Sequence, residues 1–153
     1  MGIRMTTKLS EVHDMLMREA ERVERLTIRA LSKLGEQCVT KIRDRAGDKS
    51  WYDQTGNLRS SVGYVIAHNK NIIQYSTFNQ VKQGSEGVKT GKDLAKELAK
   101  RYSNNYVLIV VAGMNYAEFV EAMDNKDVLA STELWAREKV PLMLEKLKRQ
   151  IAK

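Results

Sequence analysis

The first third of the chain carries one long helical pattern. From about residue 7 to residue 46, apolar positions recur every three or four residues, which is the spacing of one face of an α-helix. These positions are Leu9, Val12, Leu16, Val23, Leu26, Ala30, Leu34, Cys38 and Ile42. About 40 residues at 1.5 Å each span roughly 60 Å, whereas a compact domain of 153 residues has a radius of gyration near 15 Å. The helix therefore either breaks, with Gly35 the weakest point, or buries part of its stripe against another subunit. Gly47 is the expected helix stop.

The middle of the chain changes to a β pattern. Residues 61–67 alternate, with Val62, Tyr64 and Ile66 on one face, and residues 71–78 are rich in β-branched and aromatic side chains. This pair predicts a β-hairpin with its turn at residues 68–70. Residues 106–112, with the sequence YVLIVVA, are apolar throughout and predict a central strand that is buried on both faces.

A loop and a short helix are expected between the hairpin and the apolar strand. Residues 79–89 show no periodicity and contain Gly84, Ser85 and Gly87 among polar residues, which predicts a mobile loop. Thr90 and Asp93 have the spacing of a helix cap, and the apolar positions that follow predict a short amphipathic helix to about Tyr102.

The chain is predicted to close with a helix. Residues 115–123 fit a helical turn and an edge strand equally well, and residues 127–130 are a further short-strand candidate. Ser131 is a good N-cap for a last helix to about Ile151. Pro141 must kink or restart this helix, because proline cannot donate to the preceding turn. The side chains expected to face inward are Leu134, Val140, Leu144, Leu147 and Ile151.

Together these elements predict a single α+β domain over residues 1–153. It has a long N-terminal helix (about 7–46), then a small, mostly antiparallel sheet with a short middle helix (about 55–130). A C-terminal helix (about 131–151) packs on the sheet. The composition, 42% hydrophobic and 29% charged, is typical of a globular protein. No apolar run reaches the roughly 18 to 20 residues of a membrane span, and no signal-peptide run opens the chain, so we expect no membrane association and no export.

The net charge of +7 calls for a test of nucleic-acid binding. However, the charge is unevenly placed. Residues 137–153 hold six basic and two acidic side chains, whereas residues 104–136 hold one lysine and five acidic side chains. A basic terminal segment after an acidic one suits head-to-tail contacts between copies at least as well as phosphate binding. Only Trp51 and Tyr52 lie among basic residues in the way that single-strand stacking requires, so direct nucleic-acid binding is not the favoured hypothesis.

No recognisable catalytic set is present. The sequence lacks G-x-S-x-G, G-x-x-x-x-G-K-[ST], H-E-x-x-H and a Gly-rich dinucleotide turn. Cys38 stands alone, which is typical of a packing residue in a reducing compartment. His13 and His68 have no further ligand at zinc spacing. We therefore expect no enzymatic activity, no cofactor and no metal site.

The segment DQTGNLRSS, which starts at Asp53, is the most distinctive local motif. Asp53 or Thr55 can cap a short helical turn through a side-chain oxygen, and Gly56 tolerates unusual backbone geometry. Leu58 is expected to enter the core. Arg59 is expected to point outward, where it is free to pair across an interface.

In its order of motifs, the chain resembles the siphophage minor tail-component family, whose members act as head-to-tail joining or tail-completion proteins. The resemblance rests on WYDQTGNLRSSVGYVI after a long N-terminal helix and on NYAEFVEA before a closing amphipathic helix. In that family a TG-x-L-R element enters the first strand, and a Tyr-Ala-x-x-Val-Glu element follows the buried strand. The corresponding candidate interface residues are Thr55, Gly56, Leu58, Arg59, Tyr116, Ala117, Val120 and Glu121.

The resemblance implies a bacteriophage structural protein that is not an enzyme. It implies assembly as a ring, commonly of six copies, between the capsid connector and the tail tube. The implied partners are further copies of the chain and the connector and tail-tube proteins. The implied location is the neck or tail of the virion, after synthesis in the cytoplasm of the bacterial host. The rival hypothesis is a basic DNA-binding module, whose affinity for duplex DNA falls steeply with salt.

Overall fold

A computed structural model describes residues 1–4, 6–45, 50–123 and 126–153. Helices and a small antiparallel sheet follow one another along these residues, which confirms the predicted α+β class. The elements are α1 (Leu9–Arg43), α2 (Asn57–Ser60), β1 (Val62–His68), β2 (Asn71–Tyr75), α3 (Ser85–Ala99), β3 (Tyr106–Ala112), α4 (Ala117–Glu121) and α5 (Ala130–Ile151).

The sheet has the strand order β2-β1-β3, and both pairings are antiparallel. The predicted hairpin is confirmed. Asn69 and Lys70, with φ of 52° and 67°, form the two-residue connection that the twist of a hairpin favours. The prediction that residues 106–112 form the central strand is wrong, because β3 lies at the sheet edge and β1 is central. The apolar sequence of β3 has another cause: helices cover both faces of the sheet, so even an edge strand is apolar on both sides.

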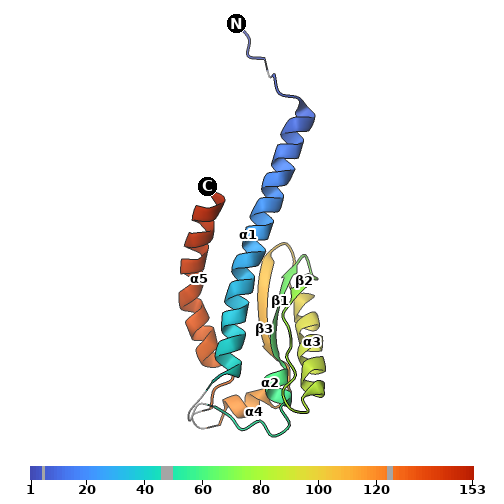
Figure 1. Ribbon diagram of the computed structural model, residues 1–153, viewed down its shortest axis with the longest axis vertical. Helices are drawn as coiled ribbons and strands as arrows, with labels where there is room; N and C mark the ends of the chain where they lie inside the picture. The colour runs from blue at the N-terminus through green and yellow to red at the C-terminus, as the bar shows by residue number, and fades with distance from the viewer. Residues whose placement is uncertain (5, 46–49, 124–125) are drawn as a thin grey trace.

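The core consists of two hydrophobic clusters, one on each face of the sheet. The α1 face holds Val39, Ile42, Trp51, Leu58, Val62, Tyr64, Ile66, Ala112 and Val128. The α3 face holds Val65, Ala67, Phe78, Ala95, Ala99, Ile109 and Val111. Figure 1 shows α1 and α3 on opposite sides of the sheet, with α5 along the outer side of α1. Helix α5 therefore joins the body mainly through α1.

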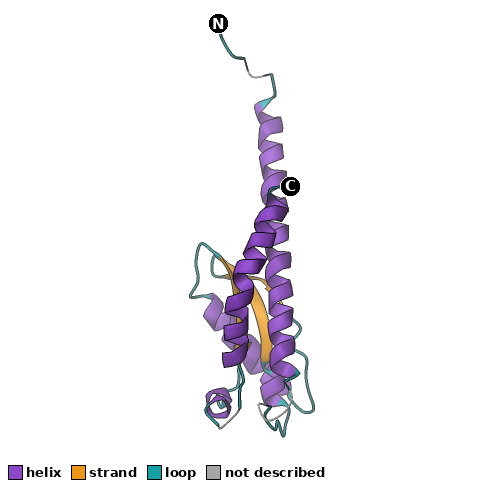
Figure 2. Cartoon of the chain, turned by 90° about the vertical axis from the view of Figure 1, so that its left-hand side faces the viewer, coloured by secondary structure: helices purple, strands orange, loops and turns teal. Residues whose placement is uncertain are grey.

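Helix α1 is continuous over 35 residues and does not break at Gly35. A Cβ atom at Gly35 would lie 2.7 Å from the ring of Tyr64, so the glycine allows α1 to approach the sheet closely. At 1.5 Å per residue the helix spans roughly 52 Å. Figures 1 and 2 show its first turns extending beyond the sheet and beyond the C-terminus of α5. The helix ends at Arg43, and the predicted stop, Gly47, lies outside the described residues.

Helix α3 starts earlier than predicted. The prediction of a loop over residues 79–89 is wrong from Ser85 onward, and the predicted cap at Thr90 and Asp93 is also wrong. Thr90 lies inside the helix, where its hydroxyl group donates to the backbone carbonyls of Glu86 and Gly87 at 3.1 Å each.

Two glycines inside α3 explain this difference. Gly87 and Gly91 lower the intrinsic helix propensity of the segment, which is why the sequence pattern favours a loop. A Cβ atom at Gly87 would lie 2.0 Å from the carbonyl oxygen of Asn57, and one at Gly91 would lie 2.4 Å from that of Ser61. Close backbone packing against α2 and the start of β1 therefore stabilises a helix that local propensity opposes.

The segment before α5 is helical and irregular rather than extended. Residues 117–121 form α4, which settles the two alternatives for residues 115–123. The short strand predicted for residues 127–130 is absent from the described residues of this region: residues 127–129 are irregular, and Ala130 begins α5. The N-cap position belongs to Leu129, so Ser131 lies in the first turn instead of capping it.

Helix α5 matches the predicted span and runs through Pro141 without restarting. Two of the side chains expected to face inward are instead exposed: Leu134 is 61% exposed and Leu144 is 44% exposed. Leu147, by contrast, is buried. The physical reason is that α5 rests mainly on a single helix, so only a narrow stripe of its surface is covered.

Candidate functional site

The first motif forms a capped turn around the carboxylate of Asp53. Its Oδ1 accepts a hydrogen bond from the backbone N–H of Gly56 at 3.0 Å, and its Oδ2 accepts one from that of Arg59 at 2.8 Å. Gly56 has a φ of +80°, and a Cβ atom there would lie 2.0 Å from the carbonyl oxygen of Val81. The predicted capping role of Asp53 and the need for glycine at position 56 are both confirmed.

Thr55 and Leu58 complete this turn. The hydroxyl oxygen of Thr55 accepts a hydrogen bond from the backbone N–H of Asn57 at 3.3 Å. Leu58 is 1% exposed and belongs to the cluster on the α1 face. The turn is thus attached to the core, as predicted.

Arg59 does not have the role predicted for it. Its guanidinium group donates to the carbonyls of Arg43 and Trp51, at 3.3 and 3.2 Å, and to the hydroxyl of Ser50 at 3.0 Å. It also lies 4.7 Å from the centre of the Trp51 ring. The prediction that Arg59 is free to pair across an interface is therefore wrong. Arg59 instead binds a carbonyl at the C-terminus of α1, where helical carbonyls have no partner within the helix.

In the second motif, Glu121 caps the start of α5. One carboxylate oxygen accepts hydrogen bonds from the backbone N–H groups of Val128 and Leu129, at 2.9 and 2.7 Å, and the other accepts one from Ala130 at 3.0 Å. A carboxylate is well suited to the N-terminus of a helix, where unpaired N–H groups carry partial positive charge. Glu121 therefore fixes the angle at which α5 leaves α4.

Asp127 and Arg45 support the same junction. Asp127 accepts a hydrogen bond from the backbone N–H of Ser131 at 3.1 Å and forms a salt bridge with Arg45. Arg45, which follows α1, also donates to the hydroxyl groups of Ser131 and Thr132. Burial alone raises the pKa of Asp127, but the hydrogen bonds from Ser131 and the charge of Arg45 outweigh burial, so this pKa lies below its ordinary value.

The two motifs meet at one end of the molecule, called here the α4 end, where α2 and α4 lie (Figure 1). Ala117 and Val120 pack against the same core cluster as Leu58. Burial, followed by the nearby charge of Asp53, raises the pKa of the Tyr116 hydroxyl, and the side chain of Thr55 opposes this shift. The candidate residues therefore form one structural unit, in which most of them support the fold.

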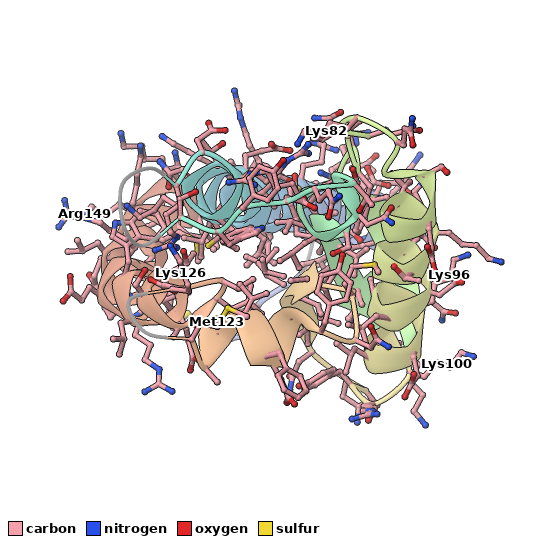
Figure 3. The ribbon with its side chains drawn as sticks, turned by 90° about the horizontal axis from the view of Figure 1, so that it is seen from below. Lys82, Lys96, Lys100, Met123, Lys126 and Arg149 are labelled. Atoms are coloured by element: carbon pink, nitrogen blue, oxygen red, sulfur yellow. The ribbon has the colours of Figure 1, made fainter. Side chains whose placement is uncertain are left out.

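The outer surface of the α4 end exposes apolar side chains. Tyr52, Phe119 and Met123 are 86%, 77% and 56% exposed. Figure 3, which looks along the long axis from this end, shows Met123 at the end of α4 nearest α5. Phe119 occupies a variable position of the Tyr-Ala-x-x-Val-Glu element and was not a predicted site residue. A large apolar side chain at a position that the motif leaves free is the signal that identifies it.

A second surface feature is a groove of about 590 Å³ between α1 and α5, called here the α1–α5 groove. Its lining includes four exposed cations and no acidic residue. The cations are Arg29, Lys33, Lys139 and Lys146. Sequence analysis found the basic terminal segment, but only the packing of α5 along α1 brings its lysines beside the cations of α1.

Cys38 is not placed for nucleophilic chemistry. Burial raises the pKa of the Cys38 thiol, which is 3% exposed, whereas a nucleophilic cysteine needs a lowered pKa and access to substrate. In the part of the chain that the structure describes, no three His, Cys, Asp or Glu side chains gather closely enough to hold a metal ion. In the same residues, no helical segment combines the length and hydrophobicity of a bilayer span.

Comparison with protein-family models, curated proteins and solved structures yields no significant match for this chain.

Proposed function

We propose that this protein is a bacteriophage structural protein of the head–tail interface or of tail completion. In this role it is a ring subunit that joins the capsid connector to the tail tube, in the neck or tail of the virion. It is made in the cytoplasm of the bacterial host, and its partners are further copies of itself and the connector and tail-tube proteins.

The observation that carries this proposal is the free segment of α1, residues 9–20. All of these residues are exposed except Val12, which is half-buried. The large apolar side chains among them are Leu9, Met15, Leu16 and Met17, which are 75%, 64%, 66% and 50% exposed. Large apolar side chains exposed on a helix that extends beyond its own domain are typical of a surface that another chain covers.

The shape of the molecule also supports a joining role. The free segment of α1 and the α4 end lie at opposite ends of the long axis (Figure 1), and each exposes large apolar side chains. A subunit that connects two structures needs a binding surface toward each of them. The resemblance of the two motifs to those of the siphophage minor tail-component family also supports this proposal.

Light scattering after gel filtration, at several protein and salt concentrations, tests the assembly. We expect a species larger than the monomer, and we expect the fraction of protein in this species to increase with protein concentration. A strictly monomeric chain at every concentration would count against the ring. The identity of the neighbouring genes tests the virion role independently: portal, capsid and tail-tube genes are expected beside this one, and their absence would contradict the assignment.

A basic DNA-binding module is the second candidate, and the four cations of the α1–α5 groove favour it. This function predicts binding of a short DNA duplex that weakens steeply as salt rises, because each neutralised phosphate releases a counterion. Fluorescence anisotropy with a labelled duplex at low salt measures it. If the anisotropy of the labelled duplex does not change at low salt, the DNA-binding function is excluded.

A further inference from the structure

The α1–α5 groove combines a charged rim with an apolar floor. Leu26, Leu34 and Leu147 belong to its lining and are partly or fully buried. The four cations at its rim are exposed, and none of them forms an ion pair with another described residue. Phosphate groups would pair with the cations but would make no favourable contact with the apolar floor. An amphipathic segment that carries both an acidic and a large apolar side chain would use both.

Helix α4 carries such a segment. Phe119 and Met123 are large apolar side chains of this region that are more than half exposed, and their spacing of four residues places them on one side of a helical turn. The turn continues past α4, because the backbone N–H of Met123 donates to the carbonyl of Val120 at 3.2 Å. Glu118, next to Phe119, is exposed and forms no ion pair with another described residue. The charge of α4 and its apolar anchor are thus complementary to the groove.

We propose that the α1–α5 groove of one copy holds α4 of a second copy, with Phe119 against the apolar floor and Glu118 beside the cations of the rim. This inference rests on the proposed function, because it names the surfaces through which the copies meet. An exposed aromatic residue that becomes fully desolvated in a pocket is the usual anchor of a protein interface, and complementary rim charges set its register.

The docking must be between copies and head-to-tail. Helix α4 lies at the end of the molecule where α5 begins (Figure 1), whereas the α5 residues of the groove run from Lys139 to Gln150. At 1.5 Å per residue, Lys139 is already roughly 13 Å along α5 from Ala130. A chain therefore cannot place α4 in its own groove. A contact between two different surfaces of the same protein produces a closed ring when the rotation closes and a filament when it does not.

The test removes one surface at a time. Phe119→Ser disables α4, and Lys139→Glu with Lys146→Glu disables the groove. The matched controls are Leu134→Ser, another exposed apolar residue, and Lys96→Glu with Lys100→Glu, two lysines that extend from α3 on the far side of the molecule (Figure 3). Sedimentation velocity measures self-association, and circular dichroism confirms that each variant is folded.

We expect either disabled surface to raise the dissociation constant of self-association by roughly tenfold or more, and the controls to leave it unchanged. A mixture of the two disabled variants is expected to regain association in 1:1 pairs through this contact, because one intact α4 and one intact groove remain. Adding Glu118→Lys to the groove variant is expected to restore part of the wild-type affinity.

Two results would overturn this docking. One is self-association that is insensitive to both disabled surfaces, which leaves assembly through α1 and the proposed function intact. The other is a groove variant that loses affinity for a DNA duplex while its self-association is unchanged, which assigns the groove to phosphate. Conversely, assembly that depends on both surfaces in a chain absent from phage particles would keep the docking and overturn the proposed function.

Discussion

At the scale of single residues, side chains from outside a helix determine how the helices meet at the α4 end. Glu121 and Asp127 supply the acceptors that the first turn of α5 needs, and Arg45 connects that turn to the end of α1. Arg59 supports the same C-terminal end of α1 by donating to the Arg43 carbonyl. The junction is therefore a small polar network around helix termini, where unpaired backbone groups must find partners.

Replacement of Glu121 tests the capping role. Glu121→Ala removes the acceptor of three backbone N–H groups and is expected to lower the free energy of unfolding by about 1 to 3 kcal/mol. Glu121→Gln keeps one carbonyl oxygen and is expected to cost less. Urea denaturation followed by circular dichroism measures both. Glu138→Gln, an exposed position on α5, is the control, and an effect of Glu121→Ala no larger than this control would contradict the capping role.

Asp127 predicts a pH dependence of stability. Its folded-state pKa lies below the ordinary value near 4, so the ionised form contributes stability above that value, and this contribution is lost as the pH falls through the lowered pKa. We expect the free energy of unfolding of the wild type to fall more steeply between about pH 5 and pH 2 than that of Asp127→Asn. Urea titrations at several pH values measure this difference. Asp93→Asn, at an exposed position, should keep the wild-type slope.

Gly56, in the first motif, is expected not to tolerate a side chain. Gly56→Ala places a side chain at a φ of +80° and brings its Cβ close to the Val81 carbonyl oxygen. The left-handed conformation alone costs about 1 to 2 kcal/mol, so we expect a loss of at least about 2 kcal/mol in the free energy of unfolding. Gly2→Ala, which has nothing within 4 Å, is the matched control. Equal midpoints of urea unfolding for the two variants would contradict the claim that a side chain at position 56 is strained.

At the scale of elements, α1 has two parts with different environments. Its C-terminal part packs on the sheet through buried residues such as Val39 and Ile42, whereas residues 9–20 contact little of their own chain. The same apolar spacing runs through both parts. Periodicity therefore reports which side of a helix is apolar, and it does not report what covers that side.

Paired substitutions in α1 separate these two environments. Ile42 is 0% exposed, so Ile42→Ala is expected to lower the free energy of unfolding by about 2 to 5 kcal/mol. Leu16 is 66% exposed, so Leu16→Ala should change it by less than about 0.5 kcal/mol in dilute protein. Urea denaturation at low protein concentration measures both. In concentrated protein, we expect Leu16→Ala to weaken self-association, and an unchanged dissociation constant would argue against the free segment as an interface.

At the scale of the whole molecule, the two ends and the α1–α5 groove provide three separate surfaces. The free segment of α1 exposes four large apolar side chains together with charged ones, whereas the groove is rimmed by cations and the α4 end carries Glu118 beside Phe119. Apolar contacts and charge pairs between such surfaces respond differently to salt. Apolar contacts persist or strengthen as salt rises, whereas charge pairing between exposed groups is screened beyond a Debye length of about 10 Å at 0.1 M.

Salt dependence therefore distinguishes the two modes of assembly. If α4 docks in the groove, raising sodium chloride from about 50 to 500 mM is expected to increase the dissociation constant of self-association, because rim charges are screened. The Lys139→Glu and Lys146→Glu variant should show a flatter dependence. Sedimentation velocity across the salt series measures it. Self-association that strengthens with salt in the wild type would instead indicate that apolar contacts dominate.

Much of the fold follows from local sequence. The 3.6-residue periodicity predicted α1 and α5, and alternation with β-branched residues predicted the hairpin of β1 and β2. The capped turn at Asp53 and the buried Leu58 were also predicted, since capping and a left-handed glycine are properties of a few neighbouring residues. Local sequence therefore determined which segments form helices, strands and tight turns wherever propensity and periodicity agree.

The tertiary structure decided the rest, because the deciding partners lie far away in the sequence. Close approach to Asn57 makes Gly87 a helix residue, and the carbonyl of Arg43 turns Arg59 inward. Cover by helices on both faces of the sheet makes an edge strand as apolar as a central one. The α1–α5 groove likewise exists only once α5 lies along α1. A sequence specifies local conformation through neighbouring residues, whereas burial, pairing and surface shape depend on which distant segments meet.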